Sequence, residues 1–169
     1  TVLSSKFVRS ITLLFVAVGT LAVTSCKKEE PVVTSIAYFR IINASPTLGT
    51  FDAYINGQKA NTAALPFGGT IRYVQPASGQ CDVKFTIAND VDAVLTKSVT
   101  LTTNLAYSYY LIGKGASLDG LLITDVMSNT ATDKAYVKFI NLSPDAPELS
   151  LNVLGGASLS TNKAYKATS

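Results

Sequence analysis

The 169-residue chain contains no histidine and no tryptophan, two cysteines, and only 15% charged residues. Without histidine, Ser-His-Asp and Cys-His catalysis and imidazole-ligated metal sites are excluded. Two cysteines cannot form a four-cysteine zinc site. Lys and Arg number 14 against 11 Asp and Glu, but two of the basic residues, Lys6 and Arg9, lie in the predicted signal, and the remainder has no basic stripe of the kind that nucleic-acid-binding proteins use. These absences predict a protein that is not an enzyme and has neither a cofactor nor a nucleic-acid partner.

The N-terminal segment, residues 1–25, has the features of a signal peptide. Lys6 and Arg9 precede an uncharged apolar run from Ile11 to Val23. As a helix this run would rise about 20 Å, which is short of the roughly 30 Å hydrocarbon core of a bilayer. A secretory signal is therefore favoured over a membrane-spanning anchor. Because the chain begins with Thr1, we expect it to lack its natural first residues.

The residues Leu21–Cys26 resemble a bacterial lipobox, in which small residues precede a cysteine that receives diacylglycerol. This pattern predicts lipidation of Cys26, although a buried cysteine beside an apolar helix is the alternative. Residues 26–35 then form the lipidated cysteine and a tether to the membrane. Within the tether, Lys27-Lys28-Glu29-Glu30 is similar to the signals that send Bacteroidetes lipoproteins to the outer face of the outer membrane. We therefore expect the protein to be anchored in the outer membrane and to face the cell exterior; a merely solvated tether is the alternative.

Lipidation of Cys26 leaves Cys81 as the second, unpaired cysteine. An unpaired cysteine in an exported protein is either a reactive thiol or a small apolar core residue. Cys81 opens an alternating stretch in which Val83, Phe85 and Ile87 share its side of a strand, which favours the core.

From residue 36 onward the sequence consists of short runs rich in Val, Ile, Thr, Tyr and Phe, separated by turn residues such as Asn56-Gly57. This pattern predicts an all-β fold, an antiparallel immunoglobulin-like β-sandwich, because two half-buried sheets cover each other's apolar faces. The strands are expected at 36–43, 51–55, 70–75, 81–88, 94–101, 106–113, 121–126, 135–141 and 149–154.

One ten-residue segment occurs twice. The sequence Ala37–Pro46 returns as Ala135–Pro144, 98 residues later, with six of ten positions identical. A repeat of this length matches a whole sandwich domain. We therefore expect one complete module at 36–127, a linker at 128–134, and the start of a second tandem copy at 135–169 that continues beyond the chain. The alternative is that 135–154 adds strands to the first module and closes it.

The repeated segment carries a resemblance to a known family. Leu142-Ser143-Pro144-Asp145-Ala146-Pro147 resembles the Ser-Pro-Asp-Ala-Pro signature of a domain-of-unknown-function family of bacterial extracellular and lipid-anchored proteins, and Asn43-Ala44-Ser45-Pro46 matches its start. Phe51–Gly57 is similar to the strand and turn that follow this signature. The resemblance implies tandem β-sandwich domains outside the inner membrane and no particular activity. Thr47-Leu48-Gly49 replaces Asp-Ala-Pro in the first copy, which favours a structural role for the motif residues Ser45, Pro46, Ser143, Pro144, Asp145 and Pro147.

Two groups of residues are candidate sites. Asn89, Asp90 and Asp92 form a polar loop that could bind Ca²⁺ through carboxylate and carbonyl oxygens, with a solvated hairpin tip as the alternative. Tyr107, Tyr109 and Tyr110 lie in one predicted strand, where an outward face could stack on sugar rings and an inward face would belong to the core.

These observations predict a lipid-anchored module with a binding or scaffolding role, whose partner is an extracellular glycan or protein. A purely structural spacer remains open. So does a carboxylate-dependent glycan hydrolase or an accessory protein of polysaccharide uptake, because paired carboxylates are the common catalytic set that a histidine-free chain retains.

Overall fold

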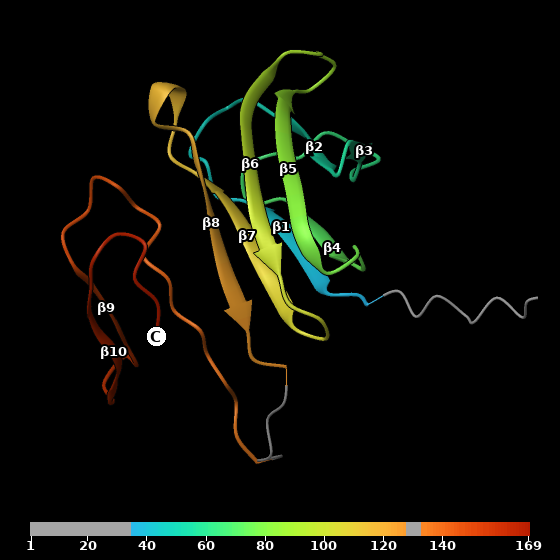
Figure 1. Ribbon diagram of the computed structural model, residues 1–169. Helices are drawn as coiled ribbons and strands as arrows, with labels where there is room; N and C mark the ends of the chain where they lie inside the picture. Colours follow the sequence, from blue (N-terminus) through green and yellow to red (C-terminus); the bar gives the residue numbers. More distant parts are fainter. Residues whose placement is uncertain (1–34, 128–132) are drawn as a thin grey trace, which may run out of the picture. The chain divides into compact units, whose positions relative to one another are not determined.

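The computed structural model describes residues 35–127 and 133–169 (Figure 1). The predicted signal peptide, Cys26 and residues 128–132 of the linker lie outside this range. The described residues form ten β-strands and one 3₁₀ turn, Gly115–Ser117, so the prediction of an all-β fold is confirmed. No helix in these ranges has the length and apolarity of a membrane span. The strands are β1 Tyr38–Asn43, β2 Phe51–Ile55, β3 Gln58–Lys59, β4 Thr70–Val74, β5 Gly79–Ile87, β6 Ala93–Leu101, β7 Ala106–Ile112, β8 Asp119–Asp125, β9 Leu149–Asn152 and β10 Ser158–Lys163.

Eight of these strands build two four-stranded sheets with the orders β4-β1-β7-β8 and β3-β2-β5-β6. All pairs within them are antiparallel except β1 with β7, which are parallel from Tyr38↔Ala106 to Asn43↔Leu111. The expectation of a purely antiparallel sandwich is corrected at this pair. A parallel pair needs a long connection, and here the whole of β2 to β6 supplies it. Local patterns did not reveal the pair because its two strands are far apart in the chain.

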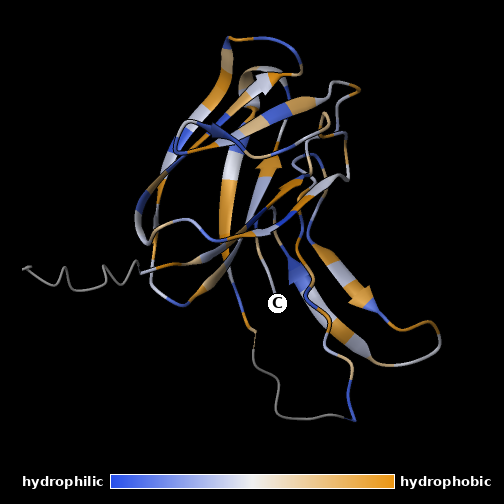
Figure 2. Cartoon of the chain, turned by 90° about the vertical axis from the view of Figure 1, so that its right-hand side faces the viewer, coloured by the Kyte–Doolittle hydropathy of each residue, from blue (hydrophilic) through white to orange (hydrophobic). Residues whose placement is uncertain are grey.

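The core lies between the two sheets and follows from the alternation along each strand. In the first sheet Phe39 and Ile41 point inward with Tyr109, and in the second sheet Val83 and Phe85 point inward to meet them; all five are fully buried. Figure 2 shows the resulting alternation of hydrophobic and hydrophilic residues along the strands. The ring of Tyr109 lies 5.9 Å from that of Phe39 and 6.1 Å from that of Phe85. Cys81 belongs to the same core and is fully buried.

The turn after β2 is the two-residue hairpin that Asn56-Gly57 predicts. Both residues have positive φ, 49° at Asn56 and 79° at Gly57, as a type I′ turn requires. The turn sets the pairing of Ile55 with Gln58 and produces the short strand β3, which was not expected from the sequence.

The segment 135–169 reproduces the hydrogen bonds of the first copy at an offset of 98 residues. In the first copy, Asn43 N–H donates to Gly69 O over 2.9 Å and Gly68 N–H donates to Asn43 O over 2.8 Å. The corresponding bonds are Asn141 N–H to Ala167 O, 3.1 Å, and Lys166 N–H to Asn141 O, 2.8 Å. The side chains agree as well: Nδ2 of Asn43 donates to Leu65 O over 3.1 Å, and Nδ2 of Asn141 donates to Lys163 O over 2.9 Å.

The strand expected at 135–141 forms only an isolated bridge, Ile140↔Thr168. This bridge is the counterpart of Ile42↔Thr70 in the first copy. Strands β9 and β10 pair with each other as a separate two-stranded sheet. Among the described residues, β9 is the counterpart of β2 at the 98-residue offset, and β10 corresponds to the segment 60–65 that follows β3.

Candidate functional site

A cluster of polar side chains lies on the outer face of the sheet β4-β1-β7-β8, and we call it the Asp125 cluster. Oδ2 of Asp125 accepts hydrogen bonds from Tyr73 Oη over 2.6 Å and from Ser108 Oγ over 2.5 Å. Arg40 Nε donates to Ser108 Oγ over 2.7 Å and lies 3.8 Å from Asp125 Oδ2. Lys138 Nζ donates to Asp125 Oδ1 over 2.8 Å and to the carbonyl of Thr124 over 3.2 Å.

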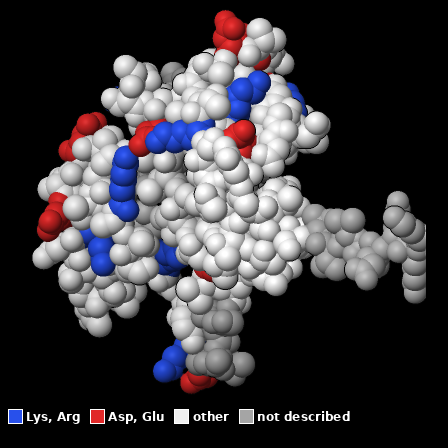
Figure 3. All heavy atoms as spheres, viewed as in Figure 1, with Lys and Arg blue, Asp and Glu red and all other residues white. Residues whose placement is uncertain are grey.

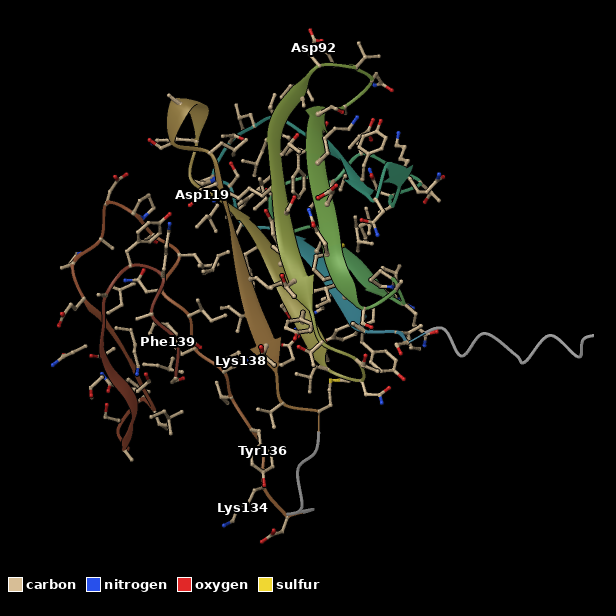
Figure 4. All side chains as sticks on the ribbon, viewed as in Figure 1. Asp92, Asp119, Lys134, Tyr136, Lys138 and Phe139 are labelled. Atoms are coloured by element: carbon tan, nitrogen blue, oxygen red, sulfur yellow. The ribbon has the colours of Figure 1, made fainter. Side chains whose placement is uncertain are left out.

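The sheet order brings these residues together from four strands. Along β7, Ser108 points away from the core because its neighbours Tyr107 and Tyr109 point inward. The parallel register places Arg40 of β1 opposite Ser108, and the antiparallel register places Asp125 of β8 opposite Ala106. In Figure 4, Lys138 is labelled beside the C-terminal end of β8.

Burial and hydrogen bonding shift the pKa of Asp125 in opposite directions. The side chain of Asp125 is only 7% exposed, and burial by itself would raise its pKa. The hydrogen bonds from Lys138, Ser108 and Tyr73 outweigh that effect and hold the pKa of Asp125 below its ordinary value. Burial and the neighbouring Asp125 raise the pKa of Tyr73. At neutral pH the cluster therefore holds a carboxylate and a neutral phenol, which are suited to bind hydroxyl groups.

A cleft of about 530 Å³ opens beside the Asp125 cluster. Arg40 and Tyr73 form part of its wall, with the guanidinium carbon 5.0 Å from the centre of the Tyr73 ring. Val126 and Met127, which are 73% and 66% exposed, line it as well. Fixed polar groups beside accessible apolar side chains are what small ligand sites use for orientation and contact area.

The three tyrosines that are candidates for a stacking platform lie on opposite faces of β7, because successive side chains of a strand point to opposite sides of the sheet. Tyr107 and Tyr109 are 5% and 0% exposed in the core, which leaves them no face for a sugar ring. The Tyr107 hydroxyl instead accepts a hydrogen bond from the amide of Thr102 over 3.1 Å. Tyr110 points to the outer face and is partly exposed, so it is the only one of the three on the side of the Asp125 cluster.

The loop with Asn89, Asp90 and Asp92 lies at the tip of the β5–β6 hairpin, where Figure 4 labels Asp92. Oδ1 of Asp90 accepts hydrogen bonds from the amides of Val91 and Asp92 over 2.7 and 3.3 Å, so this carboxylate caps its own turn. No group of three or more Asp, Glu, Cys or His side chains comes together within 35–127 and 133–169. The calcium site remains a prediction.

In the first copy, the motif residue Ser45 and the preceding Asn43 make buried hydrogen bonds that hold the segment after β1 to the end of β7. Oδ1 of Asn43 accepts a hydrogen bond from the amide of Ser45 over 3.0 Å, and Ser45 Oγ donates to the carbonyl of Gly113 over 2.6 Å. Both side chains are fully buried, and the following Pro46 is exposed. In the second segment, Asn141 and Ser143 repeat the first of these bonds over 3.0 Å. The remaining motif residues there, Pro144, Asp145 and Pro147, are exposed together with Ser143.

Asp52, in the strand after the motif, connects three segments of the chain through its carboxylate. Its side chain is 5% exposed and accepts from Lys59 Nζ over 2.9 Å, Asn61 Nδ2 over 3.0 Å and the amide of Asn89 over 3.2 Å. The hydrogen bond and charge of Lys59 hold the pKa of Asp52 below its ordinary value, against the effect of burial. These contacts tie the segment after β3 and the β5–β6 turn to β2.

Sequence reasoning did not identify the Asp125 cluster. The one available signal was the positive charge shared by Arg40 and Lys138 in the repeat, each between apolar neighbouring residues. Asp125 and Tyr73 lie 52 residues apart, and only the sheet order brings them together. On the face shown in Figure 3, basic and acidic side chains lie next to each other and do not form a separate basic patch.

Comparison with protein families places most of the chain in a known family. A family model described as "Domain of unknown function (DUF4397)" matches residues 37–152. The match includes the repeated Asn-x-Ser-Pro segments at 43–46 and 141–144 and everything between them. No curated protein matches the chain significantly.

Proposed function

The chain belongs to the DUF4397 family of domains of unknown function, and from this premise we propose that it is a lipid-anchored, non-catalytic binding module of the bacterial cell envelope. In this proposal Cys26 carries the lipid, the module faces the cell exterior from the outer membrane, and the 98-residue repeat is a tandem arrangement of modules. The ligand is an extracellular glycan or protein that contacts the outer face of the sheet β4-β1-β7-β8.

The observation that carries the proposal is the Asp125 cluster beside its cleft. The cluster presents a carboxylate, a phenol and a guanidinium in fixed positions, since each is held by a hydrogen bond or stacked on its neighbour. A sugar or peptide can exchange hydrogen bonds with such groups while it covers the exposed side chains of Val126 and Met127. Fixed groups lose little entropy on binding, which favours affinity.

The lowered pKa values of three acidic side chains support binding over catalysis. A general acid at neutral pH needs a raised carboxyl pKa, whereas the pKa values of Asp52, Asp119 and Asp125 are all lowered. For Asp119 the cause is the hydrogen bonds from Lys166 and Lys97, the first over 2.8 Å. These three carboxylates therefore remain ionised at neutral pH and are not suited to act as general acids.

Ligand binding is tested with the purified chain on a glycan array and by titration with the glycans that bind. Arg40→Ala removes one wall of the cleft, and we therefore expect at least tenfold weaker binding. Tyr73, Ser108 and Lys138 still donate hydrogen bonds to the Asp125 carboxylate in this variant. Arg72→Ala, an exposed residue of β4 that does not line the cleft, is the matched control and should bind as the unchanged chain does. Turnover of any polysaccharide that a single Asp substitution abolishes would refute the non-catalytic role.

Anchoring is tested in cells that express the full chain. A fatty-acid analogue should label the unchanged protein and the Cys81→Ala variant, but not the Cys26→Ala variant. Label on Cys26→Ala would refute lipidation at the lipobox. Protease treatment of intact cells then distinguishes a surface location, where the module is cleaved, from a periplasmic one.

A further inference from the structure

The Asp125 carboxylate uses most of its hydrogen-bonding capacity inside the Asp125 cluster. Its two oxygens accept hydrogen bonds from Tyr73, Ser108 and Lys138, and a carboxylate has about four acceptor positions in all. The Asp125 side chain is also only 7% exposed. A ligand in the adjacent cleft therefore finds at most about one free acceptor position on Asp125, and it mainly meets the residues that Asp125 holds in place.

The two cationic side chains of the cluster keep free donors. Arg40 donates through Nε to Ser108, and within 35–127 and 133–169 its terminal Nη groups make no hydrogen bond or ion pair. The Arg40 side chain is 35% exposed. Lys138 donates two hydrogen bonds out of the three that an ammonium group can make, and its side chain is 31% exposed. With one carboxylate against two cations, the cluster has a positive net charge beside the cleft.

A β-bulge in β4 brings the Tyr73 ring to the guanidinium. The register of the β1–β4 pair shifts by one residue opposite Arg40. Ile71 of β4 packs into the core, and strict alternation would send Tyr73 to the same side. The extra residue turns Tyr73 to the outer face instead, where its ring centre lies 5.0 Å from the guanidinium carbon of Arg40. Bulges are frequent beside functional sites because they re-aim a side chain in this way.

A guanidinium held in this way is suited to a planar anion with two oxygens. Its N–H groups form a fork that matches a carboxylate through two parallel hydrogen bonds. The apolar and aromatic part of the cleft consists of Val126, Met127 and Tyr136, which are 73%, 66% and 55% exposed. Figure 4 labels Tyr136 and Lys138, which belong to the same wall. A ring that bears a carboxylate therefore satisfies both the charged and the apolar part of the cleft.

The position of the cluster on a sheet face favours a sugar over a peptide. Arg40 lies on β1 and Ser108 on β7, and the backbone of each of these central strands pairs with a strand on both sides. A peptide strand binds through main-chain hydrogen bonds to a free sheet edge, which the two central strands do not offer. A sugar needs side-chain hydrogen bonds and an apolar or aromatic surface for its ring.

We propose that the cleft beside the Asp125 cluster binds acidic glycans, with the carboxylate of a uronic acid held by Arg40 and Lys138. The sugar ring covers Val126 and Met127, and Asp125 is a positioning residue that orients the two cations. This inference rests on the proposed binding function and adds the charge of the ligand to it. A neutral glycan that binds in the same cleft would leave the binding function intact and overturn the inference.

The test titrates the full chain with trigalacturonic and trimannuronic acid and with their methyl esters, which have the same rings without the charge. Because Ser169 lines the cleft, the chain carries a Gly-Ser-Gly extension that moves the terminal carboxylate away. For at least one acid we expect saturable binding by calorimetry, about tenfold or more tighter than that of its ester, as charge-assisted hydrogen bonds predict. Equal affinities for acid and ester, or no binding of either acid at millimolar concentration, would overturn the proposal.

One pair of variants separates the charge of Arg40 from its packing. Arg40→Met keeps an aliphatic stem beside the Tyr73 ring, and it should reduce the preference for acid over ester to about threefold or less. Arg72→Met changes an exposed arginine of β4 that does not line the cleft, and it should keep the full preference. A merely structural role for Arg40 would weaken the binding of acid and ester alike and leave the preference unchanged, which would contradict the proposal.

A second pair of variants keeps the test independent of how well Arg40→Met folds. Lys138→Met should weaken the binding of the acid about fivefold and leave that of the ester unchanged. Lys134→Met, at an exposed position that does not line the cleft, should bind both as the unchanged chain does. Equal affinities of these two variants for the acid would refute the role of Lys138. A hexaglutamate peptide that binds as tightly as the acid would assign the cleft to acidic proteins and overturn the sugar ligand.

Discussion

Gly120 at the start of β8 is the position where one methyl group should disturb the core most. A Cβ atom built there would lie 1.8 Å from the hydroxyl oxygen of Tyr109, 2.3 Å from Cζ and 2.9 Å from Cε1. Cβ contacts in real proteins essentially never fall below 3.0 Å. Gly120→Ala therefore requires the Tyr109 ring or the β8 backbone to move by more than 1 Å.

Neither movement is easily accommodated. Tyr109 is 0% exposed and is flanked by the rings of Phe39 and Phe85, so its displacement strains a close-packed interior. Displacement of β8 would disturb its pairing with β7, which runs the length of the strand from Asp119 to Asp125. Overpacking of this kind costs about 1–3 kcal/mol, and we expect about 3 kcal/mol because the ring is packed on both sides. For a domain of 60–100 residues, such as the module at 36–127, that corresponds to a Tm lower by about 12–24 °C.

Urea unfolding of the Gly120→Ala and Gly49→Ala variants measures the effect. Gly49 is the matched control because the nearest atom to a Cβ there, Oγ1 of Thr47, lies 3.7 Å away. The control variant should be unchanged or up to about 1 kcal/mol more stable, since alanine restricts the unfolded chain. In a Tyr109→Leu background the cost of Gly120→Ala should fall by at least about 1 kcal/mol. A loss below about 0.5 kcal/mol for Gly120→Ala in the unchanged background, well under the overpacking range, would refute the packing argument.

Three further predictions concern the other buried polar and reactive groups. Asp125→Ala leaves the hydroxyls of Tyr73 and Ser108 without their acceptor and should cost about 1–3 kcal/mol, against about 0.5–1.5 kcal/mol for Tyr73→Phe, both by urea unfolding; equal costs would contradict the central role of the carboxylate. The lowered pKa values of Asp52, Asp119 and Asp125 mean that the unfolded chain binds more protons in acid, so stability should be full above about pH 5 and fall as pH drops through and below about 4; a urea midpoint that is unchanged between pH 6 and pH 3 would contradict this. Cys81 is fully buried and burial raises its thiol pKa, so in a Cys26→Ala chain a thiol reagent should label it only after urea is added; rapid labelling of the folded chain would refute its burial.

The local patterns of the sequence predicted most of the strands correctly. Alternation along 81–88 gave β5 with Cys81, Val83 and Phe85 inward, and Asn56-Gly57 gave the hairpin after β2. The prediction that Ile87 also points inward is wrong: the pairing with β6 shifts register after Phe85, and Ile87 is 43% exposed while Thr86 is buried. The same patterns missed β3 and β10, which carry no apolar alternation, and predicted a strand at 135–141 that forms one bridge. A strand forms only when a neighbouring strand can pair with it, and a local sequence pattern contains no information about that neighbour.

The sequence by itself determined the all-β class, the 98-residue repeat and the lack of histidine chemistry, because each depends on residue identity and on spacing along the chain. Only the tertiary structure decided the parallel pairing of β1 with β7, the burial of Tyr107 and Tyr109, and the meeting of Arg40, Tyr73 and Asp125. These features depend on which strands become neighbours. Neighbour choice is set by the total apolar surface that both sheets bury, a property of the whole module that no short segment encodes.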